Sequence, residues 1–284
     1  MAASYSPSVR RRRLSAELRR LRSETGMTLN DVAKHTGISR ANLSKIEQAE
    51  SKTVPAPTLN KLLKLYEVND PTVQSAMHEL SKLAGQKGWW SLYKGLLPQT
   101  LTDFEAEACA LRTYEAQVVP GLLQTPAYAD AIFRANRVRD DNEITQRVTA
   151  RMARQNILNR LDPPTYLVII DEAAIRRMVG SVNVMREQLR HLTHMAARDS
   201  IDIYVLPFSA GAHTSTEGSY SVMDFPDPRD ASIVYLESPT TTMFLEEDHQ
   251  VRSYNDMFGS TQSCSMSPAQ TLDFLNHCIQ ELEE

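Results

Sequence analysis

The 284-residue chain has few cysteines and no long apolar stretch, and each shortage excludes a class of protein. Its three cysteines are scattered and odd in number, so we expect free thiols in a reducing compartment rather than a disulfide framework. The chain has no run of about 18 apolar residues, and it does not open with a charged-then-apolar signal segment. We therefore expect no membrane span, no secretion and a cytoplasmic location.

Motifs that bind phosphates or carry nucleophiles are also missing. The chain contains no glycine-rich phosphate loop, no Gly-x-Ser-x-Gly turn and no Cys-x-x-Cys pair. His191 and His194 have a spacing that can hold a metal, but without a third ligand two solvated histidines are the better interpretation. No motif holds two carboxylates at a catalytic separation, although six are available: Asp171, Glu172, Glu217, Glu237, Glu246 and Glu247. We expect no catalytic residue, no metal and no cofactor.

Charge is distributed unequally along the chain. Residues 1–87 contain 15 Lys and Arg against 8 Asp and Glu, a net charge of +7. Since the whole chain carries −4, residues 88–284 carry −11. This asymmetry is typical of a nucleic-acid-binding head attached to an acidic body. The polar stretch at residues 85–88 is the expected joint between a domain of residues 1–86 and a domain of residues 87–284.

Residues 28–47 have the pattern of two short helices around a tight turn. Thr28 and Asp31 have the spacing of a capping box that starts a helix, and Gly37 stands where a left-handed residue can end it. Ser39 can cap a second helix over residues 39–47, with Leu43 on its buried face. Two helices joined by a glycine-containing turn form the helix-turn-helix, whose second helix enters the major groove of duplex DNA.

The residues expected to contact DNA are polar and lie on the outer face of the second helix or in the basic stretch before the motif. Such side chains hydrogen-bond base edges and phosphates. The residues expected to contact bases or phosphates are Ser39, Arg40, Asn42, Ser44 and Lys45. Those expected to contact the DNA backbone are Thr28, Arg10, Arg11, Arg12 and Arg13. The run at residues 10–13 is expected ahead of the first helix, with Arg19, Arg20 and Arg22 as further phosphate contacts. A solvated basic terminus is the alternative.

Helical patterns on both sides of the motif complete a bundle. Leu14, Leu18 and Leu21 recur on one face of a first helix. Pro57 can stand in the first turn of a fourth helix, and Asp70 can cap a fifth. We therefore expect an N-terminal five-helix bundle of the helix-turn-helix type.

The second domain is expected to combine helices with a small mixed sheet. Its first part has helical patterns up to about residue 160, including a capping box formed by Thr102 and Glu105. Short β-branched runs at residues 166–170 and 201–206, separated by a helix, predict a parallel pair of strands. Runs at residues 219–225, 232–236 and 241–245 follow at hairpin spacing. The fold class is thus mainly α with an α/β part.

The motif resembles the helix-turn-helix of the Xre, or lambda-repressor-like, regulators. Ala33, Gly37 and the Leu-Ser-Lys-Ile-Glu segment at residues 43–47 carry the resemblance, although the glycine that this family usually has soon afterwards is absent. In order along the chain, residues 89–90, 119–129, 171–172, 185–189, 206–213 and 234–237 resemble the large C-terminal domain of actinobacterial Xre regulators. That domain is often described as antitoxin-like, and the resemblance implies a regulator of transcription.

The expected function is sequence-specific DNA binding by a homodimer whose two recognition helices read a roughly palindromic operator in the nucleoid. A small molecule or a protein partner bound by the acidic domain would modulate this activity. The residues that could line such a site are Trp89, Trp90, Phe208, Gly211, His213 and Tyr220. Alternatively, the two tryptophans only pack the joint between the domains.

Two other functions stay open at this point. The chain could be an antitoxin-like interaction protein that sequesters a small partner protein and autoregulates its own operon. Alternatively, the helix bundle could serve only to bind other proteins, which the +7 charge of residues 1–87 disfavours.

Overall fold

The computed structural model describes residues 9–51, 53–85, 92–93, 95–136, 138–227 and 230–283, and the chain divides into two compact units after residue 91. The joint expected at residues 85–88 falls largely on residues outside the described part. Trp89 and Trp90 also lie outside it. Within the described ranges, no helix is both long enough and apolar enough to cross a bilayer.

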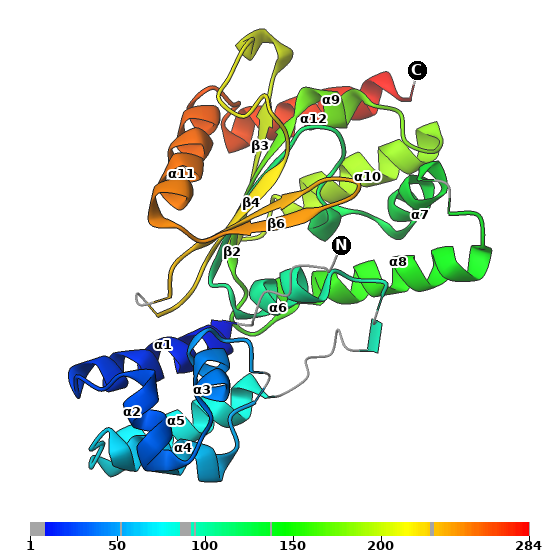
Figure 1. The fold of residues 1–284 in the computed structure, drawn as a ribbon. Helices are drawn as coiled ribbons and strands as arrows, with labels where there is room; N and C mark the ends of the chain where they lie inside the picture. The colour runs from blue at the N-terminus through cyan, green and yellow to red at the C-terminus, as the bar shows by residue number, and fades with distance from the viewer. Residues whose placement is uncertain are drawn as a thin grey trace. The chain divides into compact units, whose positions relative to one another are not determined.

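The first unit is a bundle of short helices (Figure 1). Its elements are α1 (Val9–Glu24), α2 (Leu29–Thr36), α3 (Arg40–Glu47), α4 (Ala56–Leu65) and α5 (Pro71–Ala84). Side chains from all five helices form one apolar core: Leu14, Leu18, Leu21, Val32, Leu43, Ile46, Val54, Leu59, Leu62, Leu63, Tyr66 and Met77. The helix starts expected at Pro57 and Asp70 are confirmed, and the Asp70 side chain accepts a hydrogen bond of 2.8 Å from the amide of Thr72.

The basic run was expected ahead of the first helix, and this expectation is wrong. Helix α1 begins at Val9, so the four arginines at residues 10–13 lie in its first turns. Arginine is a good helix former, and the buried Val9 extends the apolar stripe towards the N-terminus. The run is therefore part of a helix rather than an arm.

The second unit contains a six-stranded mixed sheet. Its strands are β1 (Ala110–Glu115), β2 (Thr165–Asp171), β3 (Ile201–Leu206), β4 (Tyr220–Asp224), β5 (Ile233–Glu237) and β6 (Thr242–Leu245), in the order β3-β2-β1-β4-β5-β6. The first three strands run parallel, and β4, β5 and β6 add antiparallel neighbours. The expected parallel pair and the hairpins are confirmed, as is the fold class.

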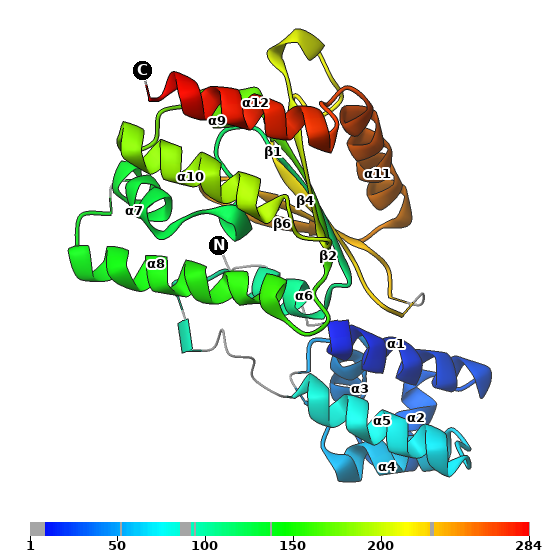
Figure 2. The same cartoon turned by 180° about the vertical axis from the view of Figure 1, so that it is seen from behind.

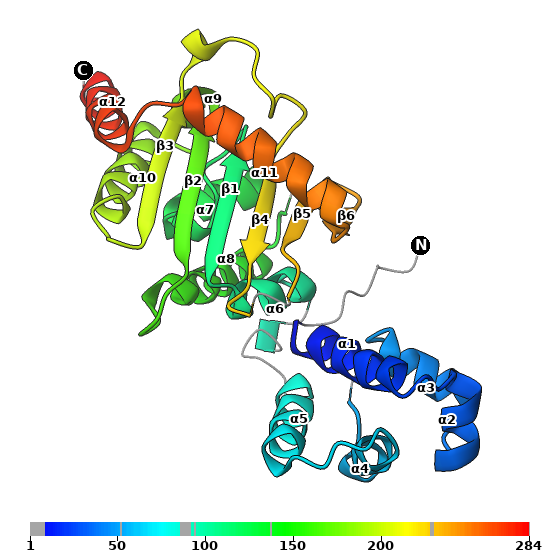
Figure 3. The same ribbon diagram turned by 90° about the vertical axis from the view of Figure 1, so that its left-hand side faces the viewer.

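Helices cover both faces of this sheet. They are α6 (Gln99–Glu107), α7 (Pro126–Ala135), α8 (Asp141–Gln155), α9 (Glu172–Arg176), α10 (Val182–Met195), α11 (Asp248–Ser263) and α12 (Pro268–Glu281). The described part of this unit also contains the short 3-10 turns η2 (Gly121–Leu123), η3 (Asn156–Asn159) and η4 (Phe208–Ala210). Helix α11 packs on one face, whereas α7, α8 and α10 lie on the other (Figure 3). Helices α10 and α12 lie side by side (Figure 2), and α12 packs against β3.

Two local expectations for the second unit are wrong. Residues 110–115 form the strand β1 rather than part of a helix. Helix α6 begins at Gln99, three residues before Thr102, so the expected capping box lies inside the helix. The Thr102 hydroxyl donates to the backbone oxygen of Pro98, and Glu105 instead pairs with Arg154.

Candidate nucleic-acid interface

Helix α2 is held at both ends by local hydrogen bonds. The Thr28 hydroxyl accepts a bond of 3.3 Å from the amide of Asp31, and the Asp31 carboxylate accepts one of 3.0 Å from the amide of Thr28. These two bonds form the predicted capping box. The Thr28 hydroxyl also donates to the Asp31 carboxylate at 2.6 Å, and this bond, followed by the one from the Thr28 amide, lowers the pKa of Asp31. At the other end, Gly37 has a left-handed φ of 72° and donates to the carbonyl of Ala33. The helix starts and ends as the sequence predicts.

Helix α3 follows after a short turn. Ser39 is its N-cap, since its hydroxyl accepts a hydrogen bond of 3.2 Å from the amide of Asn42. Leu43 and Ile46 point into the core, with 1% and 3% of their surfaces exposed. The inner face of α3 is therefore fixed against the bundle, and the opposite face is free to meet a ligand.

The outer face of α3 carries the polar residues that the sequence singled out. Arg40, Asn42 and Lys45 are exposed, and Ser44 is half-buried. Arginine and asparagine can make paired hydrogen bonds to guanine and adenine edges in the major groove, and lysine can reach bases or phosphates. The structure thus places three of these side chains on one accessible helix surface.

The C-terminal end of α3 is bound to α1 through Glu47. The sequence pattern did not reveal this role of Glu47. The Glu47 carboxylate accepts two hydrogen bonds from the Arg22 guanidinium, at 2.7 and 2.9 Å. Arg22 also donates to the carbonyl of Met27, and Arg19 donates to the carbonyl of Glu47. Only 8% of the Glu47 side chain and 18% of the Arg22 side chain are exposed. This pair fixes the orientation of α3 on α1.

Intramolecular partners also occupy other arginines of α1. Arg20 forms ion pairs with Glu17 and Glu24 on the same helix. The charges of Arg20 and Arg22 thus have partners within the unit, and their contacts to phosphates stay a prediction. The four arginines at residues 10–13 are half-buried and also have interactions within the protein.

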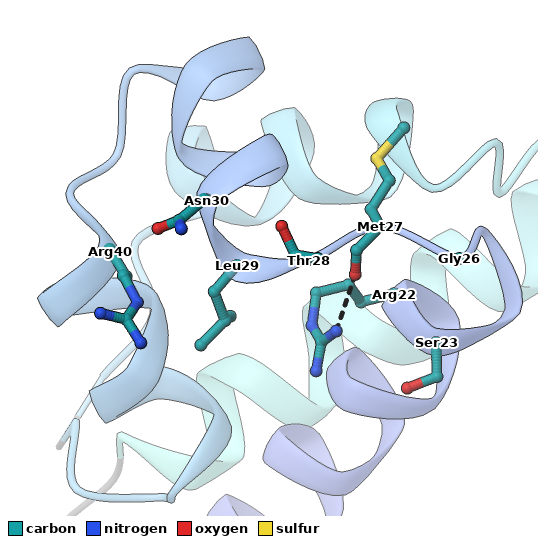
Figure 4. A pocket seen from close by; sticks show the side chains of 8 residues that line it. All are labelled: Arg22, Ser23, Gly26, Met27, Thr28, Leu29, Asn30 and Arg40. Carbon is teal, nitrogen blue, oxygen red and sulfur yellow. Dashed lines mark hydrogen bonds between the residues drawn. The ribbon is translucent and has the colours of Figure 1, made fainter.

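A shallow pocket of about 500 Å³ lies where the start of α2 meets the start of α3 (Figure 4). Its lining residues are Arg22, Ser23, Gly26, Met27, Thr28, Leu29, Asn30 and Arg40. The first amides of a helix carry partial positive charge, so a pocket at a helix start attracts anions such as phosphates. Two of the predicted DNA-contact residues, Thr28 and Arg40, are brought together here.

Four of the ligand-lining residues predicted for the second unit lie in the described part of the chain, and they differ in exposure. His213 and Tyr220 both pack against Tyr114, with ring centroids 5.7 and 5.9 Å apart. Tyr220 is 3% exposed, and its hydroxyl hydrogen-bonds that of Ser215 at 2.9 Å. Phe208, by contrast, is 59% exposed, and Gly211 lies on the surface. Tyr220 is therefore a core residue, and the ligand site stays a prediction, since Trp89 and Trp90 lie outside the described residues.

The carboxylates at the end of β2 have local structural partners. Asp171 caps α9 by accepting from the amide of Ala173 at 2.8 Å, and it also accepts from the Tyr114 hydroxyl. Glu172 pairs with Arg176 and accepts from the amide of Phe208. Nowhere in the described part of the chain do three His, Cys, Asp or Glu side chains lie close enough to hold a metal ion.

Two parts of the chain are similar to known families. Residues 98–277 match a family described as a domain of unknown function, DUF5753, and residues 13–76 match a helix-turn-helix domain. No curated protein and no solved structure matches the chain. The helix-turn-helix match spans α2 and α3 and indicates that this unit binds DNA.

Proposed function

Since the chain belongs to the DUF5753 family and carries a helix-turn-helix domain, we propose that it is a sequence-specific transcription regulator of the Xre type. Helix α3 lies in the major groove, and the acidic second unit modulates binding. The observation that carries this proposal is the outer face of α3, where Arg40, Asn42 and Lys45 are exposed on a helix that is capped at one end and fastened at the other. The proposed function includes no catalytic activity.

The side chains divide into those that read sequence and those that position the protein. Arg40, Asn42 and Lys45 contact base edges, while Ser39 and Ser44 donate to nearby phosphates. The Ser39 hydroxyl oxygen accepts the capping bond from Asn42, which leaves its own hydrogen to donate. Thr28, at the pocket beside α2, and the arginines at residues 10–13 support contacts to the sugar–phosphate backbone.

The proposed regulator acts as a homodimer. Each protomer presents one α3, so two copies related by a two-fold axis read half-sites about one DNA turn apart. A roughly palindromic operator follows from that symmetry. A protein with this function works in the cytoplasm, at the nucleoid.

The test is DNA binding by the full chain to a fragment of its own promoter and to a scrambled fragment, each at low and at moderate salt. We expect selective binding that Arg40→Ala weakens about 10- to 100-fold for the promoter fragment only. Lys64→Ala is the matched control, because it removes one exposed positive charge from α4, outside the two-helix motif. Equal, weak binding to both fragments that disappears with salt would contradict sequence readout.

The acidic second unit favours a second candidate function. Residues 88–284 carry a net charge of −11, which suits capture of a small basic partner protein, as in an antitoxin-like regulator of its own operon. Such a complex would weaken as salt screens the charges. Coexpression with the product of the adjacent reading frame and size-exclusion chromatography at two salt concentrations would separate this candidate from a ligand-gated regulator.

A further inference from the structure

A hollow in the second unit has no role in the contacts described so far. Helix α7 packs against both α8 and α10 (Figure 2), and these three elements border a pocket of about 730 Å³. Pockets that hold small molecules commonly have volumes of about 300–1,000 Å³. The hollow therefore has the size of a ligand site, and its lining determines which ligand it suits.

Small side chains form much of the pocket lining. Ala127 and Ala131 stand one turn apart on α7, and Thr145 and Thr149 stand one turn apart on α8. Gly180, which comes shortly before α10, also belongs to the lining. Because these side chains are short, the helices leave space between them that a ligand can occupy.

The lining on the side of α10 depends on glycine. Gly180 has a left-handed φ of 70°, and an added Cβ atom would lie 3.1 Å from Cβ of Ala131 and 3.3 Å from Cβ of Val184. The chain at Gly180 therefore packs closely on both α7 and α10. This close packing fixes one side of the pocket.

The pocket adjoins a small apolar cluster. Ala129, Phe133 and Ile144 are the buried members of this cluster between α7 and α8. Val148 packs against the cluster and also lines the pocket. An apolar group bound in the pocket would thus extend an existing apolar cluster, and its transfer out of water is favourable.

Helix α8 itself uses the hydroxyl groups of the lining. Thr145 donates to the carbonyl of Asp141, and Thr149 donates to the carbonyl of Thr145, both at 2.8 Å. Neither hydroxyl hydrogen is left to donate to a ligand. We therefore expect the body of the ligand to be apolar.

Part of the lining is charged. Asp130 and Arg134 of α7 both line the pocket, and they form an ion pair of 2.7 Å. Arg134 also pairs with Asp141 at 2.8 Å, so two carboxylates share one guanidinium group. The side chains of Asp130, Arg134 and Asp141 are 39%, 51% and 81% exposed. A ligand can therefore reach a group of three charges in which the negative sign prevails.

This excess of negative charge favours a cation. An ammonium group beside the two carboxylates would balance the group, whereas a ligand carboxylate would add a third negative charge. The net charge of −11 on residues 88–284 acts in the same direction, because it raises the local concentration of cations.

We propose that the pocket bordered by α7, α8 and α10 binds a small organic amine, with an apolar body and one ammonium group. The apolar body lies between the small side chains of α7 and α8, and the ammonium group faces Asp130 and Asp141 beside Arg134. This ligand would be the signal through which the second unit modulates DNA binding. That control rests on the proposed function, whereas ligand binding itself does not.

The first experiment compares three probes that share a phenylethyl body and differ in the head group. They are 2-phenylethylamine, 2-phenylethanol and 3-phenylpropanoate, and their dissociation constants for the full-length protein are measured by ligand-observed NMR. We expect the amine to bind about 10-fold more tightly than the carboxylate, with the alcohol between them. If none of the three binds at millimolar concentration, or if the carboxylate binds as tightly as the amine, the proposal is wrong.

Thr149→Phe locates the site by filling the pocket. Since Thr149 is exposed, a larger side chain there should leave the core undisturbed, and we expect the amine to bind about 10-fold more weakly or not at all. Gln146→Phe is the matched control, because Gln146 is also exposed on α8 but does not line the pocket. Unchanged affinity in Thr149→Phe, or an equal loss in Gln146→Phe, would overturn the proposal.

Asp130→Asn tests the contact to the ammonium group. We expect the amine to lose about 5- to 10-fold in affinity and the alcohol to bind as before, because the variant removes a charge and preserves side-chain size. Glu143→Gln is the control, since it removes another carboxylate near the start of α8, one that pairs with Arg147 at 2.7 Å. If Asp130→Asn weakens both probes equally, its role is structural and the assigned contact is wrong.

Other outcomes separate the site from the proposed function. A second copy seated on the pocket would leave no probe binding, and Thr149→Phe would then lower the molar mass measured by light scattering, which would overturn the proposal. A protein that binds the amine and not the promoter fragment would disprove the regulator and leave the site intact.

Discussion

The two units of this protein differ in how their interiors are built. In the helix-turn-helix unit, an apolar core fills the interior and the unpaired polar side chains of α3 face outward. In the second unit, Arg154 and Glu105 form an interior ion pair whose side chains are 15% and 5% exposed. The corresponding pair of the first unit, Arg22 with Glu47, is slightly more exposed, at 18% and 8%. The comparison suggests that an Arg–Glu pair contributes more to stability the less water can reach it.

Each unit nevertheless contains a two-point Arg–Glu pair, and these pairs allow the comparison to be tested. Removing one partner leaves the other charge unpaired, and the cost depends on how deeply that charge is buried. We expect the effects below to decrease from the interior pair to the helix cap.

The largest effect is expected from Glu105→Ala. The Arg154 and Glu105 side chains are only 15% and 5% exposed, so the variant leaves a buried guanidinium without its partner. We expect a loss of about 3–5 kcal/mol in the free energy of unfolding, measured by chemical denaturation. Glu143→Ala is the control. Glu143 pairs with Arg147 on α8, and their side chains are 42% and 32% exposed, so this pair should contribute less than about 1 kcal/mol. Similar losses in both variants would mean that the interior pair has no special role.

A smaller effect is expected from Glu47→Ala. Arg22 is 18% exposed, so water can partly solvate it after its partner is removed, and a loss of about 2–3 kcal/mol follows. Because Glu47 also fastens the end of α3, DNA affinity should fall in a variant that remains folded. Glu24→Ala removes an exposed partner of Arg20 and should change stability by less than about 1 kcal/mol. Normal DNA affinity in Glu47→Ala would show that the pair does not orient α3.

The smallest effect is expected from Thr28→Ala, which removes the capping hydroxyl of α2. We expect a loss of about 1 kcal/mol, and Thr28→Ser should largely retain the wild-type stability because it keeps the hydroxyl. Circular dichroism during thermal melting measures both. Equal stability of the alanine and serine variants would contradict a stabilising cap.

The first unit could be predicted closely from the sequence because its signals are local. The cap at Thr28, the left-handed Gly37 and the apolar stripe of α3 each lie within a few residues of what they determine. Strand β1 could not be predicted in this way, since residues 110–115 include Arg112 and Glu115 and contain a single β-branched residue. Its extended form depends on pairing with β2 and β4, which come from distant parts of the chain.

The same distinction applies to the candidate sites. Arg40, Asn42 and Lys45 could be identified because helical spacing keeps them off the face that Leu43 and Ile46 bury. The pair between Arg154 and Glu105 could not be identified, because only the fold brings α8 and α6 together. Sequence spacing contains no information about such long-range contacts.

The fastening of α3 at both ends has a consequence for engineering. Ser39 holds the first turn, Glu47 holds the last, and Leu43 fills the core between them, so the exposed positions can change without disturbing the bundle. The helix therefore works as an exchangeable cassette. New operator preferences should be obtainable by randomising residues 40, 42 and 45 alone, with the fold and the acidic unit of the parent protein left unaltered.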